Sequence, residues 1–169
     1  RSVKCLGVTL LDDNSILGVH PMGVRHMKTD KKVVEWKAPG GRPVSRAAVN
    51  SRQVVVVVDT AAKGGGLGSE LIYFELDAAG QLTEVDSREL DAEVTSLDIG
   101  VVPEGRTRFP FLAVGHVDKS VSVLSLDSSD LFQQRALMQA PSRPCDLKFL
   151  QKDTGAEGVL SLNIGLQSG

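Results

Sequence analysis

The amino-acid sequence predicts an all-β fold made of many short strands. Val, Ile and Thr supply 22, 4 and 7 of the 169 residues, about a fifth of the chain, and β-branched side chains favour strands. The 17 glycines and seven prolines fall mostly between the Val-rich runs, as in HPMG (20–23) and APGGRP (38–43), where they mark turns. Helical periodicity is nearly absent, because its best candidate, RELDAEV (88–94), is too short for a stable helix and is expected to lead into a strand.

Runs of four to eight apolar or alternating residues define the expected strands. They cover residues 3–10, 15–20, 23–28, 32–37, 44–50, 53–59, 70–76, 81–87, 94–101, 109–115, 119–126, 132–138, 144–150 and 157–164.

A repeat at a spacing of 50 residues indicates which all-β fold these strands form. GSELIYFELDAAGQL (68–82) superposes on DKSVSVLSLDSSDLF (118–132), with Asp77 on Asp127, and RPCDL (143–147) starts a third copy. A repeat of this length with four strands in each copy is typical of the four-stranded antiparallel blade of a β-propeller. The sequence therefore predicts blades at about 1–43, 44–93 and 94–142 and the start of a further blade at 143–169. It also predicts a flexible loop at 60–69, within the second blade.

Three to four blades are fewer than most closed rings use, since these have about four to eight. Arg1 at the start and the turn Ser168-Gly169 at the end both look like internal positions, so we expect an arc of a larger propeller. An open arc exposes sheet edges, and the uncharged strand Val54–Val58 has high β propensity, so we expect the isolated chain to associate. A complete β-sandwich or barrel is the alternative fold.

Composition narrows the class of protein. The chain is 41% hydrophobic and 24% charged, with a net charge of −2, which is typical of a soluble globular protein. The sequence contains no run of about 18 apolar residues, so we expect no membrane span. Cys5 and Cys145 lie far apart and match no metal-binding or paired-thiol spacing, which fits a reducing compartment.

No motif predicts catalysis, a cofactor or a metal site. The glycines between Gly64 and Gly68 lack the Lys-Ser/Thr that completes a phosphate-binding loop, and they join two strands. His20, His26 and His116 have no helical pairing and no neighbouring Cys, and His116 is expected in a turn. The nucleophile-elbow motif and the HExxH zinc motif are both missing, so we expect no enzyme.

Uneven charge supplies the one candidate site, a partner-contact surface. Residues 1–52 carry ten Lys and Arg against four acidic residues, a net charge of +6, whereas the rest of the chain has a net charge of −8. The candidate contact residues, which we call the basic set, are Arg25, His26, Lys28, Lys31 and Lys32. A solvated outer strand is the alternative interpretation, and direct RNA binding is disfavoured because only 4% of the residues are aromatic.

Two further positions have structural interpretations. Trp36 alternates with the charged Glu35 and Lys37, a pattern that predicts a buried face between blades. Arg106 and Arg108 form a second small basic spot, which we expect to face solvent.

The motifs resemble a known family over essentially the whole chain. The matching segments are HPMGVRHMKTDKKVVEWKAPG (20–40), AVNSRQVVVVV (48–58), SELIYFELDAAGQL (69–82), RFPFLAVGHVDKSVSVLSLD (108–127) and SLNIGLQSG (161–169). They look like the second, central propeller of the splicing factor 3B subunit 3 family, the 130-kDa spliceosome-associated proteins. The wider group includes damage-specific DNA-binding protein 1 and the cleavage and polyadenylation specificity factor A subunit, each with three seven-bladed propellers.

This resemblance implies a nuclear, non-catalytic scaffold of the splicing factor 3b complex, which supports branch-site recognition in pre-mRNA splicing. It implies a HEAT-repeat subunit and a small helical subunit as partners, with RNA contact indirect or weak and neither a membrane nor a small-molecule substrate. The alternatives are an adaptor of a cullin ubiquitin ligase or of mRNA 3′-end processing and, more distantly, a propeller hydrolase. The chain departs from the family at Thr60–Ser69, where a short TGGE-like turn is expected and several Gly and Ala residues are inserted.

Overall fold

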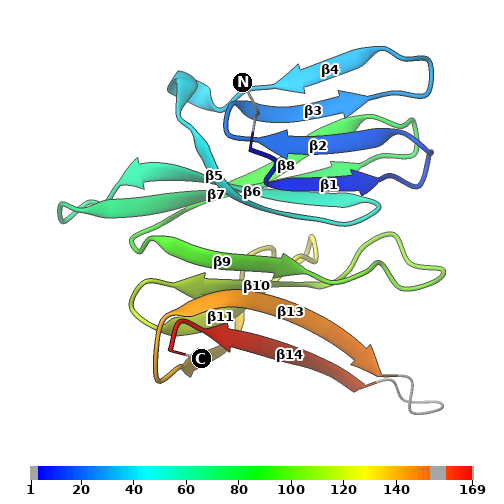
Figure 1. Cartoon of the computed structure of the whole chain (residues 1–169). Helices are drawn as coiled ribbons and strands as arrows, with labels where there is room; N and C mark the ends of the chain where they lie inside the picture. The colour runs from blue at the N-terminus through cyan, green and yellow to red at the C-terminus, as the bar shows by residue number, and fades with distance from the viewer. Residues whose placement is uncertain (1–3, 153–158, 169) are drawn as a thin grey trace. The chain divides into compact units, whose positions relative to one another are not determined.

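The fold of the chain is all-β, as the sequence predicts. A computed structural model describes residues 4–152 and 159–168, and in this part of the chain antiparallel sheets are the regular structure, with one 3-10 turn at Pro39–Gly41 and no α-helix (Figure 1). Within the described ranges, no helix is long and apolar enough to cross a bilayer.

The chain divides into two compact units, and neither unit is a continuous stretch. The first contains the residues up to Glu93 together with Val102–Arg108, and the second contains Val94–Val101 together with the residues from Phe109 onward. The backbone therefore leaves the first unit after Glu93, returns to it at Val102 and leaves it again after Arg108.

The first unit holds two four-stranded sheets, each with its strands in chain order. The first sheet contains β1 (Gly7–Leu10), β2 (Ile16–His20), β3 (Gly23–Met27) and β4 (Val33–Trp36). The second contains β5 (Val44–Val49), β6 (Gln53–Ala61), β7 (Leu67–Leu76) and β8 (Leu82–Leu90). Every neighbouring pair is antiparallel, which is the arrangement of a propeller blade.

The second unit repeats this arrangement. One sheet contains β9 (Val94–Ile99), β10 (Phe111–His116), β11 (Ser120–Ser125) and β12 (Gln134–Gln139), again in chain order. A hairpin follows, formed by β13 (Pro144–Lys152) and β14 (Val159–Leu166).

The core of the first unit lies between its two sheets. Leu17, Val19 and Val24 of the first sheet belong to the same buried cluster as Ile72 and Phe74 of the second. The valines of β6 are all 0% exposed, and this central strand is hydrogen-bonded to β5 and β7 on either side. The strand expected to promote association is therefore an interior strand.

In the second unit, a buried cluster joins the β9–β12 sheet to the hairpin. Ala113 and Val121 pack with Leu147 of β13, and Phe149 lies against this cluster. Polar contacts join β9 to the hairpin: the Thr95 hydroxyl donates to the carbonyl of Pro144 at 2.6 Å, and the amide of Phe149 donates to Asp98 Oδ2 at 2.8 Å.

Half of the expected loop at 60–69 is strand in the structure. Thr60 pairs with Gly68 and Ala61 with Leu67, so only residues 62–66 connect β6 to β7. Gly65 and Gly66 have φ values of 84° and 101°, in the region that glycine adopts at low cost, and they close the turn. The glycines and alanines of this segment therefore form the end of a hairpin.

One row of apolar side chains on the first sheet remains exposed. Cross-strand register places Leu10 beside Ile16, Ile16 beside Met27, and Met27 beside Val33, so the row crosses all four strands. These side chains are 58%, 43%, 41% and 49% exposed, respectively, on the face opposite the core. We call them the apolar row.

Candidate interaction surface

The structure brings four members of the basic set to the surface of one hairpin. Arg25 lies on β3, and Lys28, Lys31 and Lys32 lie in or beside the turn that joins β3 to β4. The turn is closed by backbone hydrogen bonds from the Lys28 amide to the Lys32 carbonyl at 2.8 Å and from the Lys31 amide to the Lys28 carbonyl at 2.9 Å. Lys31 has a φ of 67°, so this turn holds a left-handed residue.

The fifth member, His26, is not on that surface. Side chains alternate along a strand, so His26 faces the opposite side of β3 from Arg25, and it is only 3% exposed. Its Nε2 atom is hydrogen-bonded to the hydroxyl of Ser15 at 2.7 Å. Burial lowers the pKa of His26, so the ring is neutral at pH 7 and adds no charge to the surface.

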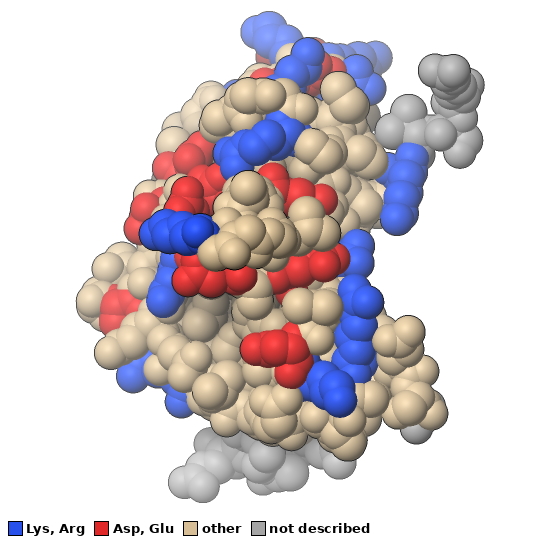
Figure 2. All heavy atoms as spheres, turned by 90° about the vertical axis from the view of Figure 1, so that its left-hand side faces the viewer, with Lys and Arg blue, Asp and Glu red and all other residues tan. Residues whose placement is uncertain are grey.

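Acidic neighbours offset part of the charge on the hairpin. Arg25 forms a cross-strand ion pair with Glu35, with its Nη2 atom 2.8 Å from Oε1. Lys32 pairs with Asp30 at 3.0 Å, and the backbone and side-chain hydrogen bonds from Lys32 lower the pKa of Asp30. Lys28 and Lys31 have no ion-pair partner among the described residues. Figure 2 shows Lys and Arg beside Asp and Glu at the top of the face that it displays, at the height of β3 and β4 in Figure 1; the β3–β4 turn lies on the right of Figure 1, away from that face.

The two arginines of the second basic spot, Arg106 and Arg108, lie in different environments. Arg106 is exposed, as expected, but Arg108 is only partly exposed because it forms a bidentate ion pair with Glu75. Arg108 Nε lies 2.9 Å from Glu75 Oε1, and Nη2 lies 3.2 Å from Oε2. Arg108 therefore ties the returning segment 102–108 to β7 and is not a free surface cation.

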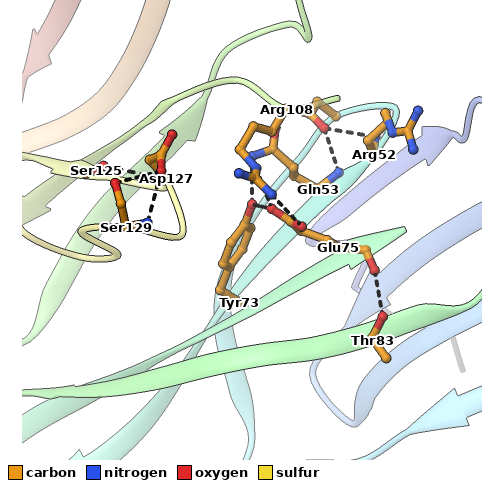
Figure 3. Close-up of polar contacts among 10 residues, drawn as sticks. Arg52, Gln53, Tyr73, Glu75, Thr83, Arg108, Ser125, Asp127 and Ser129 are labelled. Atoms are coloured by element: carbon orange, nitrogen blue, oxygen red, sulfur yellow. Dashed lines mark hydrogen bonds and ion pairs between the residues drawn. The ribbon is translucent and has the colours of Figure 1, made fainter. Parts of the chain in front are cut away.

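A buried polar network continues from this ion pair (Figure 3). The Tyr73 hydroxyl donates to Glu75 Oε1 at 2.5 Å and accepts from Gln53 Nε2 at 2.8 Å. Gln53 Oε1 in turn accepts from Asn50 Nδ2 at 2.9 Å. Burial, reinforced by the hydrogen bond to Glu75, raises the pKa of Tyr73. Each member has a satisfied partner, so the network holds strands together and offers no free nucleophile or base.

Two clusters contain the residue types of a serine hydrolase, but not its geometry. In the first unit, the Ser15 hydroxyl contacts both Asp13 and His26, so the serine lies between the acid and the imidazole. In a catalytic triad the histidine lies between the acid and the serine, where it can accept the proton of the hydroxyl while the acid orients it.

The second cluster also lacks this order. His116, expected in a turn, is the last residue of β10 and is 9% exposed, because its ring points inward to the hydroxyl of Ser122 at 2.9 Å. Asp118 accepts from the amide and hydroxyl of Ser120, at 2.9 and 2.6 Å. Burial lowers the pKa of His116. Within the described residues, no group of three or more His, Cys, Asp and Glu is arranged to hold a metal ion.

Trp36 lies between the two sheets of the first unit, as its pattern predicts. It packs edge-on against Phe74 of β7, with ring centroids 5.1 Å apart and planes at 79°. Arg108, Gln53 and Tyr73 are structural residues that sequence reasoning did not single out as a network, because their contacts join positions 20 or more residues apart.

The comparison with known families decides where the chain belongs. All of residues 1–169 match the family model described as the RSE1/DDB1/CPSF1 second beta-propeller. The chain belongs to this family.

Relatives of this second-propeller family carry splicing names. The chain is 42% identical over 172 residues to "Spliceosome-associated protein 130 A" of Arabidopsis thaliana and 40% identical over 175 residues to "Splicing factor 3B subunit 3" of Danio rerio, each covering 97% of the chain. It is 39% identical over 171 residues to "Pre-mRNA-splicing factor rse1" of Emericella nidulans, covering 99% of the chain. The chain spans about 14% of the length of each of these proteins.

Proposed function

We propose that the chain is a non-catalytic β-propeller scaffold of the splicing factor 3b complex and supports branch-site recognition in pre-mRNA splicing. The observation that carries the proposal is the match of nearly the whole chain, at 39–42% identity, to proteins named as splicing factors. We infer that each four-stranded sheet is one blade of a seven-bladed ring. A nuclear location follows from this role.

The absence of an enzymatic role is supported by the site chemistry. The two Asp, Ser and His clusters lack the acid–histidine–serine order that a hydrolase needs: Ser15 lies between Asp13 and His26, and Asp118 is hydrogen-bonded to Ser120 while His116 contacts Ser122. A scaffold works through rigid surfaces made of ordinary side chains, which fits such a site.

The partners that we propose are a HEAT-repeat subunit and a small helical subunit of the same complex. Affinity purification of the tagged protein from nuclear extract tests this, with the bound proteins identified by mass spectrometry. A HEAT-repeat protein in the eluate is the expected result. Its absence, or recovery of a cullin in its place, would overturn the splicing assignment.

We further propose that the four exposed cations of the β3–β4 hairpin contact an acidic partner surface. The change to test is reversal of Arg25, Lys28, Lys31 and Lys32 to Glu. Charge reversal at an interface rim acts mainly on association rate and on its salt dependence, so we expect affinity for the purified complex to fall about tenfold at low salt.

The matched control reverses four exposed cations elsewhere, Lys4, Lys63, Arg106 and Lys148. Equal affinity of the hairpin variant and the unmodified protein would dispose of the contact.

A further inference from the structure

A cavity of about 190 Å³ lies within the first unit, between the outer strands of its two sheets. Trp36 of β4 and Phe74 of β7 form part of its wall, and Glu84 of β8 and Gln81, just before that strand, line it from the second sheet. Small-molecule sites usually enclose about 300–1,000 Å³, so this cavity fits a single side chain better than a whole ligand.

The aromatic part of the wall favours a cation. Trp36 is partly exposed, and its ring stands at 79° to that of Phe74, so two ring systems meet at a corner of the cavity. The face of an aromatic ring attracts a positive charge, most strongly for tryptophan. The same corner supplies apolar surface for the methylene groups of a long side chain.

The charged residues of the cavity add to this preference. Glu84 supplies a carboxylate to the cavity, and no Lys or Arg of the described residues lines it. Glu35 also borders the cavity, but its side chain pairs with Arg25 on the opposite face of the sheet. Glu84 is exposed and has no ion pair or side-chain hydrogen bond within the described ranges. His26, which also lines the cavity, is buried and its pKa is lowered, so it is neutral and does not repel a cation.

We propose that this cavity binds a basic side chain, arginine or lysine, presented by an extended segment of a partner protein. The cationic head lies over Trp36 and pairs with Glu84, and the methylene stem lies along the apolar wall. A nucleic-acid backbone is disfavoured as the occupant, because phosphates would face the Glu84 carboxylate and no Lys or Arg among the lining residues. The site lies on the opposite face of β3 from Arg25, whose proposed partner is acidic.

Trp36 is the only tryptophan of the chain, so its fluorescence reports on this cavity alone. The experiment titrates the full chain with the blocked peptide Gly-Gly-Arg-Gly-Gly, with its lysine counterpart, and with the uncharged citrulline counterpart. We expect a saturable change in Trp36 emission with the arginine or lysine peptide and none with the citrulline peptide. No saturable change with either basic peptide, or an equal change with citrulline, would overturn the proposal.

A pair of matched variants separates the site from general electrostatics. Glu84→Gln removes the cavity carboxylate. Asp86→Asn removes one charge from the same strand, at a position that lies opposite Tyr73 in the strand register and does not line the cavity. An exposed ion pair contributes up to about 1 kcal/mol, so we expect Glu84→Gln to weaken peptide binding about threefold to fivefold. Asp86→Asn should leave the affinity unchanged. Equal weakening by both variants would show only long-range attraction and would overturn the assignment. This outcome is independent of whether the protein co-purifies with a splicing complex.

Discussion

At the scale of single residues, Tyr73 shows how strongly the interior perturbs a side chain. It is the only tyrosine, its ring is 0% exposed, and its hydroxyl lies between the amide of Gln53 and the carboxylate of Glu75. Ionisation would place a second negative charge beside Glu75 in a dry site, which is why the pKa of Tyr73 is raised.

Titration of Tyr73 by ultraviolet absorbance should therefore show no tyrosinate at the ordinary pKa of about 10 while the chain stays folded. The unfolded chain loses this proton near pH 10 and the folded chain keeps it, so the stabilisation is present below pH 10 and falls as the pH rises above that value. In Tyr73→Phe the tyrosinate signal disappears and this part of the alkaline destabilisation disappears with it. A tyrosinate midpoint near 10 in the folded chain would contradict the expectation.

Gly100 is a position where the structure excludes a side chain. A Cβ atom there would lie 2.5–2.7 Å from three ring carbons of Phe109, which is itself buried. We expect Gly100→Ala to lower the free energy of unfolding by about 1–3 kcal/mol, the usual cost of overpacking. Urea denaturation measures this difference.

The matched control for Gly100 is Gly18→Ala, since an added Cβ at Gly18 would meet nothing within 4 Å. We expect it to be neutral or to stabilise the chain by up to about 1 kcal/mol, because alanine loses less backbone freedom on folding than glycine. Equal destabilisation by both substitutions would mean that the Phe109 contact does not decide the cost.

At the scale of elements, burial of two histidines on strand faces gives the sheets a pH dependence. His26 lies on β3 and His116 at the end of β10, and burial is the main reason that the pKa of each is lowered. Below the ordinary pKa of about 6.5 the unfolded chain binds protons that the folded chain does not. Stability should therefore fall as the pH decreases below about 6.5.

Imidazole resonances followed by NMR test this expectation directly. Those of His26 and His116 should titrate with pKa values below about 6.5. The doubly substituted chain, His26→Gln with His116→Gln, should lose the part of the acid destabilisation that begins near that pH. Resonances that titrate at or above the ordinary value would show that burial does not control these rings.

The strands were predictable from the sequence because each one is a local pattern. Val54–Val58, flanked by turn residues, was recognisable as a strand, and the structure places it in β6. The extension of β6 to Ala61 and of β7 back to Leu67 was missed because glycines usually mark loops, whereas here the glycine turn is confined to residues 62–66. Partners distant in sequence were also missed. Nothing in the sequence near Arg108 shows that it will form an ion pair with Glu75, and nothing near His26 shows that it will be buried with a hydrogen bond to Ser15.

At the scale of the whole molecule, the apolar row of the first sheet is the feature that bears on association. Its four side chains are contiguous across β1 to β4 and are 41–58% exposed. Contiguous exposed apolar surface promotes association, whereas single exposed apolar residues do not.

Light scattering should accordingly find the 169-residue chain associated, and replacement of Ile16 and Met27 by Lys should make it monomeric. The control places Lys at Leu67 and Val101, which are 64% and 82% exposed and lie outside the row. We expect this control to associate as the unmodified chain does. A monodisperse monomer of the unmodified chain would contradict the role given to the row.

The return of segment 102–108 to the first unit has a consequence for synthesis of the chain on the ribosome. The last strand of this unit ends at Leu90, which emerges from the exit tunnel before Arg108. Glu75 receives its guanidinium partner only when Arg108 has emerged as well. Until then a carboxylate beside the buried Tyr73 has no counter-charge. The nascent first unit therefore passes through a stage in which its strands exist and its last electrostatic contact does not, and that contact closes only after eighteen more residues have been translated.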